Sequence, residues 1–340
     1  MAIRQVRRPR ASDIEAAWAV VRSRLDPTPV DAAGGPGLLL KLESLQPTGS
    51  FKVRGAVNAL AALDRGAAVV TASAGNHGLG VAFAAALLGR KATVVVPGNA
   101  SPAKVAALRR FPVTLVEAGR SYDDAEARAL ELAGPGIHYV SPYNDPHVIA
   151  GQATIGRELA DQVGGPLTVV CPVGGGGLAS GLGLWASQRD DVVIVGVEAE
   201  ASLAVSAAVL AGRQVDVAVG DTIADGVSGN IEPGSVTVDI IRDHVESLVC
   251  VTEEEIRAAI RHLAVSHGIV AEGAGAMAVA AVLAGKVRSD HLADDLSGHR
   301  ADHRADHRVV ALVTGRNIAL ATLAEVLAGT GLAGTGTIMG

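Results

Sequence analysis

The sequence predicts an α/β fold with two domains, each an open, mostly parallel sheet covered by helices. Short apolar runs such as 68–71 and 92–96 alternate with longer, helix-like runs such as 79–88 and 101–110. This alternation is typical of parallel strands buried between two layers of helices. A chain of 340 residues has the length of about two domains. We therefore expect two α/β units.

The expected domain boundaries lie where the alternating pattern starts and stops. A first alternating block runs from 68 to 145, and we expect it to form a small domain that carries a substrate loop. A second block contains a strand at 167–171 and continues to a last strand at 309–313. The large domain is then expected to consist of residues 1–67 together with 146–340.

Local signals mark several helix ends. Ser12 and Glu15 have the spacing of a capping box, which predicts a helix start at Ser12. Pro27 predicts that this helix ends at the residue before it. Thr252 and Glu255 repeat the capping-box spacing. The other expected elements are strands at 38–42, 113–116, 138–140, 192–197 and 247–251, and helices at 53–63, 122–132, 149–163 and 274–284.

Composition and charge exclude several classes of protein. Hydrophobic residues make up 49% and charged residues 19%, as in globular proteins rather than disordered ones. The net charge of −6 gives no basis for a nucleic-acid or anionic-membrane partner. Two cysteines, Cys171 and Cys250, form no disulfide framework, which indicates a reducing compartment. Since residues 1–10 lack the apolar run of a secretory signal, we expect a soluble, cytoplasmic protein.

Lys52 lies between a turn and a helix-like run, directly after Phe51. Desolvation lowers the pKa of a lysine, and a neutral amine can form a Schiff base with an aldehyde. Lysine is more often a solvated surface residue, and this segment alone favours that simpler interpretation. Other segments have to decide between the two.

A glycine loop after the strand at 167–171 offers a site for an anion. It contains, in order, Gly174, Gly175, Gly176, Gly177 and Leu178. Backbone N–H groups at a helix start attract anions, and consecutive glycines can close around one phosphate. The segment also matches G-x-G-x-x-A through Ala179, with Glu198 after the next strand, which is typical of a dinucleotide site. Both interpretations stay open at this point.

A second loop, between the strand at 68–71 and the helix at 79–88, combines polar donors. It contains Ser73, Ala74, Gly75, Asn76, His77 and Gly78. Such donors at a helix start suit a carboxylate, although serine and asparagine are also common helix caps. A Schiff-base lysine, a phosphate loop and a carboxylate loop together indicate pyridoxal phosphate holding an amino acid. A redox enzyme would leave Lys52 without a role.

The sequence resembles the serine/threonine dehydratases, which belong to the tryptophan-synthase-β-like, fold-type-II class of pyridoxal-phosphate enzymes. Five separated motifs carry the resemblance over roughly residues 12 to 325. They are residues 41–56, 73–78, 148–154, 172–178 and 271–276. The resemblance implies a two-domain fold-type-II enzyme with pyridoxal 5′-phosphate as its cofactor. Family members are commonly dimers, so it also implies a homodimer.

The resemblance assigns roles to individual residues. Lys52 would hold the cofactor as a Schiff base, with Phe51 packed near its ring. Asn76 would donate to the cofactor's 3′-oxygen, and Glu272 would lie at the cofactor site. The Gly174–Leu178 loop would bind the phosphate. The substrate carboxylate would be bound by Ser73, Ala74, Gly75, Asn76 and His77.

The partner of the pyridine nitrogen would be Thr314, in the segment Thr314-Gly315-Arg316-Asn317 where the family usually has Ser-Gly-Gly-Asn. A neutral hydroxyl keeps the ring nitrogen protonated less well than a carboxylate, so the ring is a weaker electron sink. This favours elimination from an amino acid that has a leaving group on Cβ. Lys52 would be the base. The implied activity is deamination of a β-hydroxy amino acid, with L-threonine or L-serine as the leading substrates.

Three residues differ from those typical of related enzymes, and these differences argue against some of the activities found in the class. Ala74 stands where eukaryotic serine racemases have a second serine, so a racemase would lack its second acid/base. His77 stands where cysteine synthases usually have a threonine. Ala204 replaces an aspartate ligand of the divalent-cation site of some relatives, which would otherwise lie at Glu198 and the Ser202 carbonyl, so we expect no metal.

Several alternatives remain open from the sequence. The substrate could instead be 3-hydroxyaspartate, phenylserine or a hydroxyectoine-derived amino acid. An amino-acid racemase and, more remotely, a dinucleotide-dependent oxidoreductase are the other candidates. No regulatory domain follows Gly340, so feedback by isoleucine is not expected.

The segment 297–308 repeats Arg-Ala-Asp-His, with His299, His303 and His307 four residues apart. On a helix these three side chains would share a face and could bind a divalent metal. Low-complexity polar runs seldom build packed sites, so we interpret the segment as a solvated surface insertion.

Overall fold

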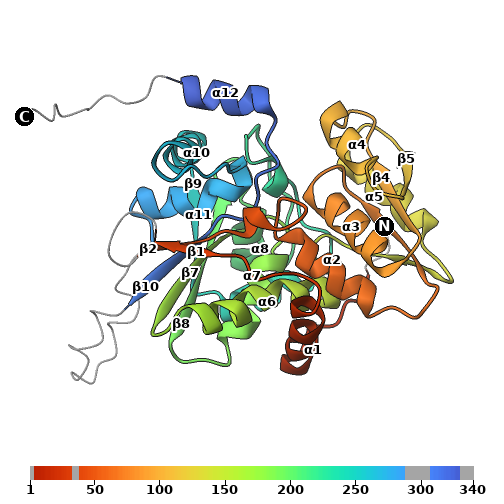
Figure 1. Ribbon diagram of the computed structural model, residues 1–340, viewed down its shortest axis with the longest axis horizontal. Coiled ribbons are helices and arrows are strands. Elements are labelled where there is room, and N and C mark those ends of the chain that lie inside the picture. The colour runs from red at the N-terminus through yellow and green to blue at the C-terminus, as the bar shows by residue number, and fades with distance from the viewer. Residues whose placement is uncertain (1–3, 33–37, 288–306, 330–340) are drawn as a thin grey trace, which may run out of the picture.

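Two sheets organise the chain in the computed structural model, which describes residues 4–32, 38–287 and 307–329 (Figure 1). The larger sheet has the strand order β1-β2-β10-β7-β8-β9, and the smaller has the order β5-β4-β3-β6. The expected α/β class with mostly parallel sheets is confirmed. The strands are β1 (Val30–Ala32), β2 (Leu38–Lys41), β3 (Ala68–Ala72), β4 (Ala92–Val96), β5 (Thr114–Glu117), β6 (Ile137–Tyr139), β7 (Leu167–Pro172), β8 (Val192–Ala199), β9 (Ser247–Val251) and β10 (Arg308–Leu312).

Helices connect most of these strands. The α-helices are α1 (Ala11–Arg22), α2 (Lys52–Ala61), α3 (Asn76–Leu88), α4 (Pro102–Leu108), α5 (Tyr122–Leu132), α6 (Pro146–Gln162), α7 (Gly177–Ala186), α8 (Ala204–Ala211), α9 (Val236–His244), α10 (Glu253–His267), α11 (Gly273–Leu283) and α12 (Leu320–Ala328). Two short 3₁₀ helices, η1 (Glu43–Leu45) and η2 (Asp225–Val227), complete the described elements.

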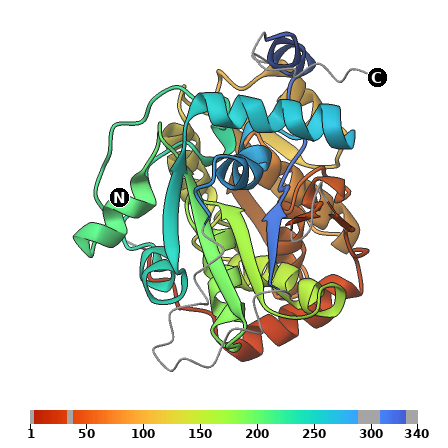
Figure 2. The same cartoon turned by 90° about the vertical axis from the view of Figure 1, so that its left-hand side faces the viewer.

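The late strand β10 lies in the middle of the larger sheet, parallel to both β2 and β7 (Figure 2). Among the described strands only β1 runs antiparallel, at the edge of the sheet beside β2. The chain after β10 therefore passes the chain after β2, where Ser50 and Gly315 form a bridge. This pairing brings the Lys52 segment next to Thr314 although they are far apart in the sequence.

Alternate residues of the larger sheet enter two separate cores. Val169 of β7 packs in one core with residues of α6 to α9, and Val170 packs in the other with residues of α10 and α11. Successive side chains of a strand point to opposite faces, so a strand covered on both faces is mostly apolar. All six residues of β7 are buried accordingly.

The smaller sheet is covered in the same way. Val94 of β4 packs with residues of α3 and α4, whereas Val95 packs with residues of α5. All four strands of this sheet are parallel and fall within residues 68–139.

Helices α2 and α6 cross where two glycines meet. A Cβ on Gly151 would lie 2.6 Å from the Cα of Gly55, closer than any side chain tolerates. The absence of a side chain at Gly151 therefore lets α2, which begins at Lys52, approach α6 this closely. The crossing sets the position of the Lys52 helix relative to the larger sheet.

The predicted start of the first helix was wrong, whereas the second capping box is confirmed. Helix α1 begins at Ala11 with Arg10 as its N-cap, and the Asp13 carboxylate accepts the Arg10 N–H at 2.7 Å. Asp13 thus accepts the N–H of Arg10, as Glu15 was expected to accept the N–H of Ser12. At α10, Thr252 and Glu255 form the predicted reciprocal pair.

Two features bear on the remaining expectations from the sequence. Across the three described segments, no helix combines the length and apolarity needed to cross a membrane. The repeat at 297–308 lies outside the described residues except for its end, where His307 contacts the Thr168 hydroxyl at 2.9 Å.

Candidate active site

A cavity of about 530 Å³ lies where strands of both sheets end. Ser73 follows β3, Gly174 follows β7 and Thr314 follows β10, since parallel strands present their carboxyl ends at one edge. Every predicted site residue lines this cavity. These residues are Phe51, Lys52, Ser73, Ala74, Gly75, Asn76, His77, Gly174, Gly175, Gly176, Gly177, Leu178, Glu272 and Thr314.

Lys52 is the first residue of α2 and is only partly exposed. Its ammonium donates to the Pro142 carbonyl at 3.0 Å and lies 5.2 Å from the centre of the Phe51 ring. Burial lowers the pKa of Lys52 to about 8, although the Glu272 carboxylate opposes the shift. The solvated-lysine interpretation of this segment was therefore wrong, because Lys52 is held in the cavity wall.

The glycine loop connects the end of β7 with the start of α7 and has no room for side chains. A Cβ on Gly175 would lie 2.3 Å from the Tyr143 ring, and one on Gly177 would lie 2.8 Å from the Tyr143 Cα. Gly176 adopts a φ of +85°, which favours glycine. The first N–H groups of α7 have no partner within the helix, so the loop is a cradle suited to a phosphate.

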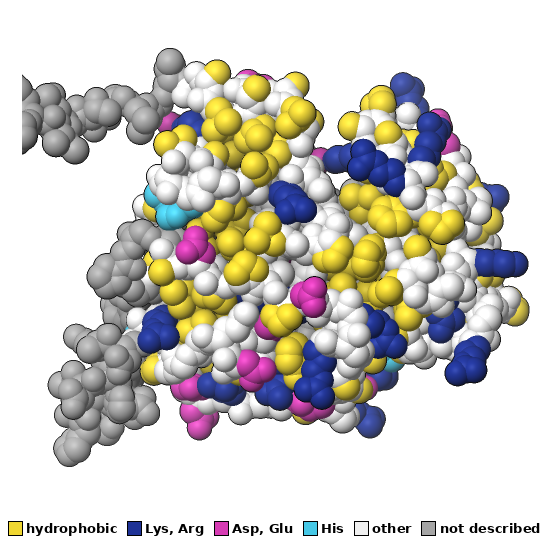
Figure 3. All heavy atoms as spheres, viewed as in Figure 1, with side chains coloured by type: hydrophobic (Ala, Val, Ile, Leu, Met, Phe, Trp, Pro, Cys, Tyr) yellow, Lys and Arg dark blue, Asp and Glu magenta, His cyan; other side chains and the backbone are white. Residues whose placement is uncertain are grey.

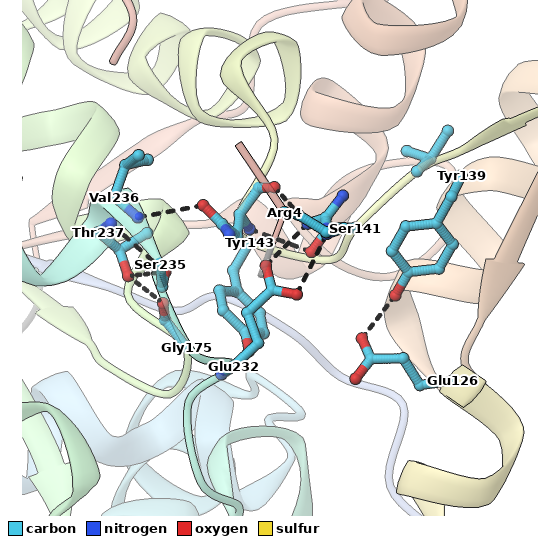
Figure 4. A network of polar contacts seen from close by, with 12 residues as sticks. Arg4, Glu126, Tyr139, Ser141, Tyr143, Gly175, Glu232, Ser235, Val236 and Thr237 are labelled. Atoms are coloured by element: carbon cyan, nitrogen blue, oxygen red, sulfur yellow. Dashed lines mark hydrogen bonds and ion pairs between the residues drawn. The ribbon is translucent and has the colours of Figure 1, made fainter. Parts of the chain in front are cut away.

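Side chains from three regions hold this loop in place (Figure 4). The Tyr143 hydroxyl accepts the Glu232 N–H at 2.8 Å, and Arg4 pairs with the Glu232 carboxylate at 2.7 Å. The Thr237 hydroxyl donates to the Gly175 carbonyl at 2.8 Å. None of these supports follows from the sequence, because no motif connects the chain's start to the segment around Glu232.

Asn76, Glu272 and Asn317 form a polar chain along one side of the cavity. The Asn76 amide donates to Glu272 Oε1 at 2.6 Å, and the Asn317 amide donates to Asn76 Oδ1 at 2.6 Å. Burial, and to a lesser extent the Asp225 carboxylate, raises the pKa of Glu272 to about 7. Gly315 lies directly against this chain, since a Cβ there would be 2.0 Å from Glu272 Oε1.

Thr314 presents a buried, neutral hydroxyl at the cavity wall. Its Oγ1 donates to the Ala274 carbonyl at 3.4 Å, and its own carbonyl accepts the Phe51 N–H at 3.0 Å. Because the hydroxyl rotates and its contact with Ala274 is long, Thr314 can instead donate its proton to a ligand acceptor or accept a hydrogen bond from a ligand. Arg316 does not line the cavity but is exposed, so it adds no bulk to the site.

The Ser73–His77 loop leads into the N-terminus of α3. The Ser73 hydroxyl accepts the Gly75 N–H at 3.1 Å. The Nε2 of His77 lies 3.0 Å from the Val140 carbonyl, which can only accept, so Nε2 carries the proton. Burial lowers the pKa of His77 to about 3, so the ring is neutral. The imidazole thus has no N–H to offer an anion, and the backbone N–H groups of α3 remain.

Glu198 lies outside the cavity lining. Its carboxylate accepts the N–H groups of Val205 at 2.9 Å and Ser206 at 3.0 Å, so it caps α8. Within the described residues no group of three or more His, Cys, Asp or Glu side chains is arranged to hold a metal ion. The carboxylate that a dinucleotide site would need for a ribose is occupied by this helix.

Several charged or aromatic lining residues were not predicted. They are Lys104, Tyr122, Asp123, Tyr143 and Asp225. Lys104 lies on α4 of the smaller sheet's layer and Asp225 on η2, so only the folded arrangement of the two sheets brings them to one cavity.

Comparisons with known proteins agree on one family. The family described as "Pyridoxal-phosphate dependent enzyme" matches residues 22–315. L-threonine ammonia-lyase of Thermotoga maritima is 43% identical over 254 residues, which cover 73% of this chain and 63% of that protein. The catabolic L-threonine dehydratase of Staphylococcus aureus is 36% identical over 327 residues, which cover 93% of this chain and 91% of that protein. The structure of maize serine racemase matches with a TM-score of 0.82 and 29% identity, covering 94% of this chain and 97% of that one.

Proposed function

Because this chain belongs to the family of pyridoxal-phosphate-dependent enzymes, we propose that it is an ammonia-lyase that converts L-threonine or L-serine to a 2-oxo acid and ammonia. The two relatives whose names state L-threonine as their substrate support threonine first. The reaction removes water and then returns it, so ammonia is the net loss and no oxidant is needed. The observation that carries the proposal is the meeting of Lys52, the glycine loop and Thr314 in one cavity.

The cavity residues fit pyridoxal 5′-phosphate. The glycine loop is a cradle that any Cβ would fill, and its helix start suits a phosphate. Lys52 would bind the aldehyde carbon, and Thr314 would face the ring nitrogen. Asn76 and Glu272 would lie beside the ring's remaining polar atoms, with Phe51 against the ring. These roles are proposals drawn from the arrangement of the side chains.

Lys52 is the base in this proposal, once the substrate's amino group has taken its place on the aldehyde carbon and released it as a free amine. When bound, pyridoxal phosphate withdraws electrons from the amino acid's Cα and makes the proton on that carbon acidic. An amine whose pKa is lowered to about 8 is partly neutral near pH 7 and can accept this proton. Thr314 offers no charge to the ring nitrogen, which favours loss of the β-hydroxyl over longer-lived negative charge on Cα.

The start of α3 would bind the substrate carboxylate. Backbone N–H groups at a helix N-terminus favour an anion. The Ser73 hydroxyl, which already accepts the Gly75 N–H, can donate its proton to a carboxylate oxygen. The neutral His77 ring fixes the loop through Val140 and leaves the binding to Ser73 and the backbone.

A racemase is the second candidate, supported by the match to maize serine racemase. Racemisation needs an acid/base on each face of Cα, whereas Ala74 has only a methyl group that cannot transfer a proton. We therefore expect slow racemisation. Recovering D-serine from L-serine in D₂O and measuring deuterium at Cα tests this; deuterium uptake as fast as deamination would favour the racemase.

An assay of 2-oxo acid release across β-hydroxy amino acids tests the proposed function. The panel contains L-threonine, L-serine, 3-hydroxyaspartate and phenylserine, with L-alanine as a control that lacks the leaving group. We expect equal amounts of 2-oxo acid and ammonia from threonine or serine and none from alanine. Release from phenylserine alone would move the activity to that substrate.

We further propose a small domain at 68–145 and a large domain at 1–67 and 146–340, a cytoplasmic location and a homodimer.

Hydrophobic side chains gather around α12, and this supports a second copy as partner (Figure 3). Val265 on α10 and Leu320 on α12 are 78% and 82% exposed. Sedimentation equilibrium of wild type and Leu320→Glu tests the dimer, which the charged variant should weaken; a monomeric wild type would refute it.

A further inference from the structure

The charges that line the cavity are not evenly distributed. Among the described lining residues the cations are Lys52 and Lys104, and the carboxylates are Asp123, Asp225 and Glu272. In the proposed function Lys52 either holds the cofactor or acts on the substrate's Cα proton. Lys104 is therefore the one remaining cation in the described lining that could bind a negative group on a substrate side chain.

Lys104 is already paired. Its ammonium forms an ion pair with the Asp225 carboxylate across the cavity, from α4 on one side to η2 on the other. The two side chains are 38% and 63% exposed, so the pair lies towards the open side of the cavity. Asp225 is the first residue of η2, and the neighbouring Gly226 faces Ala274, because a Cβ built on Gly226 would lie 3.4 Å from the Ala274 Cβ.

This pairing opposes any substrate with a second carboxylate. In the proposed function the Ser73–His77 loop binds the α-carboxylate of the amino acid. A second carboxylate, on the substrate side chain, needs a cation of its own. It would have to displace Asp225 from Lys104 and then lie beside the displaced carboxylate. Like charges brought together in an interface are strongly unfavourable. A neutral hydroxyl or methyl group on Cβ meets no such repulsion.

We propose that the Lys104–Asp225 ion pair sets the charge selectivity of the cavity, admitting β-hydroxy amino acids with uncharged side chains and excluding those with a side-chain carboxylate. The proposal rests on the proposed function and deepens it, because it decides between threonine or serine and 3-hydroxyaspartate. Asp225 acts by occupying Lys104 and by its own charge.

Substituting Asp225→Asn tests the inference in the holoenzyme. The asparagine frees Lys104 and removes one negative charge, so kcat/KM for 3-hydroxyaspartate relative to L-threonine should rise about tenfold or more. Asp225→Ala should give the same direction. Asp123→Asn removes an equal charge from the cavity lining without freeing Lys104, so it should raise the ratio clearly less than Asp225→Asn does. Adding Lys104→Gln to Asp225→Asn should abolish the gain.

A binding measurement separates this inference from the proposed function. L-aspartate and L-alanine lack the β-hydroxyl, and their dissociation constants can be measured from changes in the holoenzyme's visible spectrum. Asp225→Asn should lower the dissociation constant of L-aspartate, relative to that of L-alanine, by a similar factor. A wild-type chain that deaminates no β-hydroxy amino acid would refute the proposed function, while this binding ratio would still decide the inference. An equal gain in Asp123→Asn, or no gain in either Asp225 variant, would overturn it.

Discussion

At the scale of single residues, the chemistry depends on how the cavity wall changes the pKa of Lys52. An exposed lysine is almost fully protonated at neutral pH and cannot attack an aldehyde. Burial beside Phe51 removes water from the ammonium, whereas Glu272 partly restores the preference for the charged form. The balance gives a pKa of about 8. Lys52 is thus reactive near neutral pH yet still held in place by Pro142.

This pKa predicts how cofactor loading depends on pH. Only the neutral amine reacts, so the rate at which the apo chain takes up pyridoxal phosphate should rise about tenfold per pH unit below pH 8. Above about pH 8 the rate should level off. Stopped-flow absorbance measures this rate. The reference amine is Nα-acetyl-lysine, whose free ε-amine should react faster with rising pH up to about pH 10.4. A protein curve that follows the reference amine would contradict the lowered pKa.

At the scale of elements, much of the arrangement could be predicted from the sequence. The apolar run 167–171 identified a strand, because a strand buried on both faces is mostly apolar. The Gly174–Leu178 loop identified the connection from that strand to the next helix, because its backbone geometry requires glycine. Elements with weaker patterns were not predicted. β1 has three residues and is partly exposed, and α12 has only one buried residue. Their positions depend on neighbours that the local sequence does not specify.

The crossing of α2 and α6 gives a prediction at this scale. Gly151→Ala places a methyl group 2.6 Å from the Gly55 Cα, so the helices must separate and Lys52 must move with α2. We expect a loss of about 1–3 kcal/mol in the free energy of unfolding, measured with urea. We also expect weaker cofactor binding.

Gly164→Ala is the matched control for this crossing. No other atom lies within 4 Å of its Cβ position. The control should leave both stability and cofactor binding nearly unchanged. A Gly151→Ala protein as stable as this control would mean that the close crossing is unimportant.

At the scale of the whole molecule, the site exists because segments from both sheets meet. The sequence predicted the strand-end loops, but the chain Asn317–Asn76–Glu272 joins segments after β10, after β3 and before α11. Such contacts depend on the order β2-β10-β7 in the larger sheet. No local pattern encodes that order. The ion pair between Lys104 and Asp225 was missed for the same physical reason.

A buried ion cluster joins α2 to β2 of the larger sheet and to α6. Arg54 donates to both Glu43 oxygens at 2.7 Å and also pairs with Glu158, which accepts from Lys41 at 3.0 Å. The cluster links α2, η1, β2 and α6, and its side chains are almost fully buried. Two positive and two negative charges balance one another, so each depends on the others.

Arg54→Gln should therefore be costly. It leaves two buried carboxylates with one ammonium, and we expect a loss of about 3–5 kcal/mol in the free energy of unfolding. Arg128→Gln removes an exposed pair with Glu131 at 2.9 Å and should cost at most about 1 kcal/mol. Urea denaturation of both variants measures the difference. Equal losses would show that leaving a buried carboxylate without Arg54 costs no more than breaking an exposed ion pair.

The substitution Lys52→Ala tests the central claim most directly. The measurement is 2-oxo acid release from L-threonine by wild type and variant, both reconstituted with pyridoxal phosphate. Loss of the base and of the cofactor's attachment should lower release by at least about 10²–10⁴-fold. The visible absorbance of the lysine-bound cofactor should disappear while the fold is retained. A folded Lys52→Ala protein that releases 2-oxobutanoate within tenfold of wild type would contradict the account.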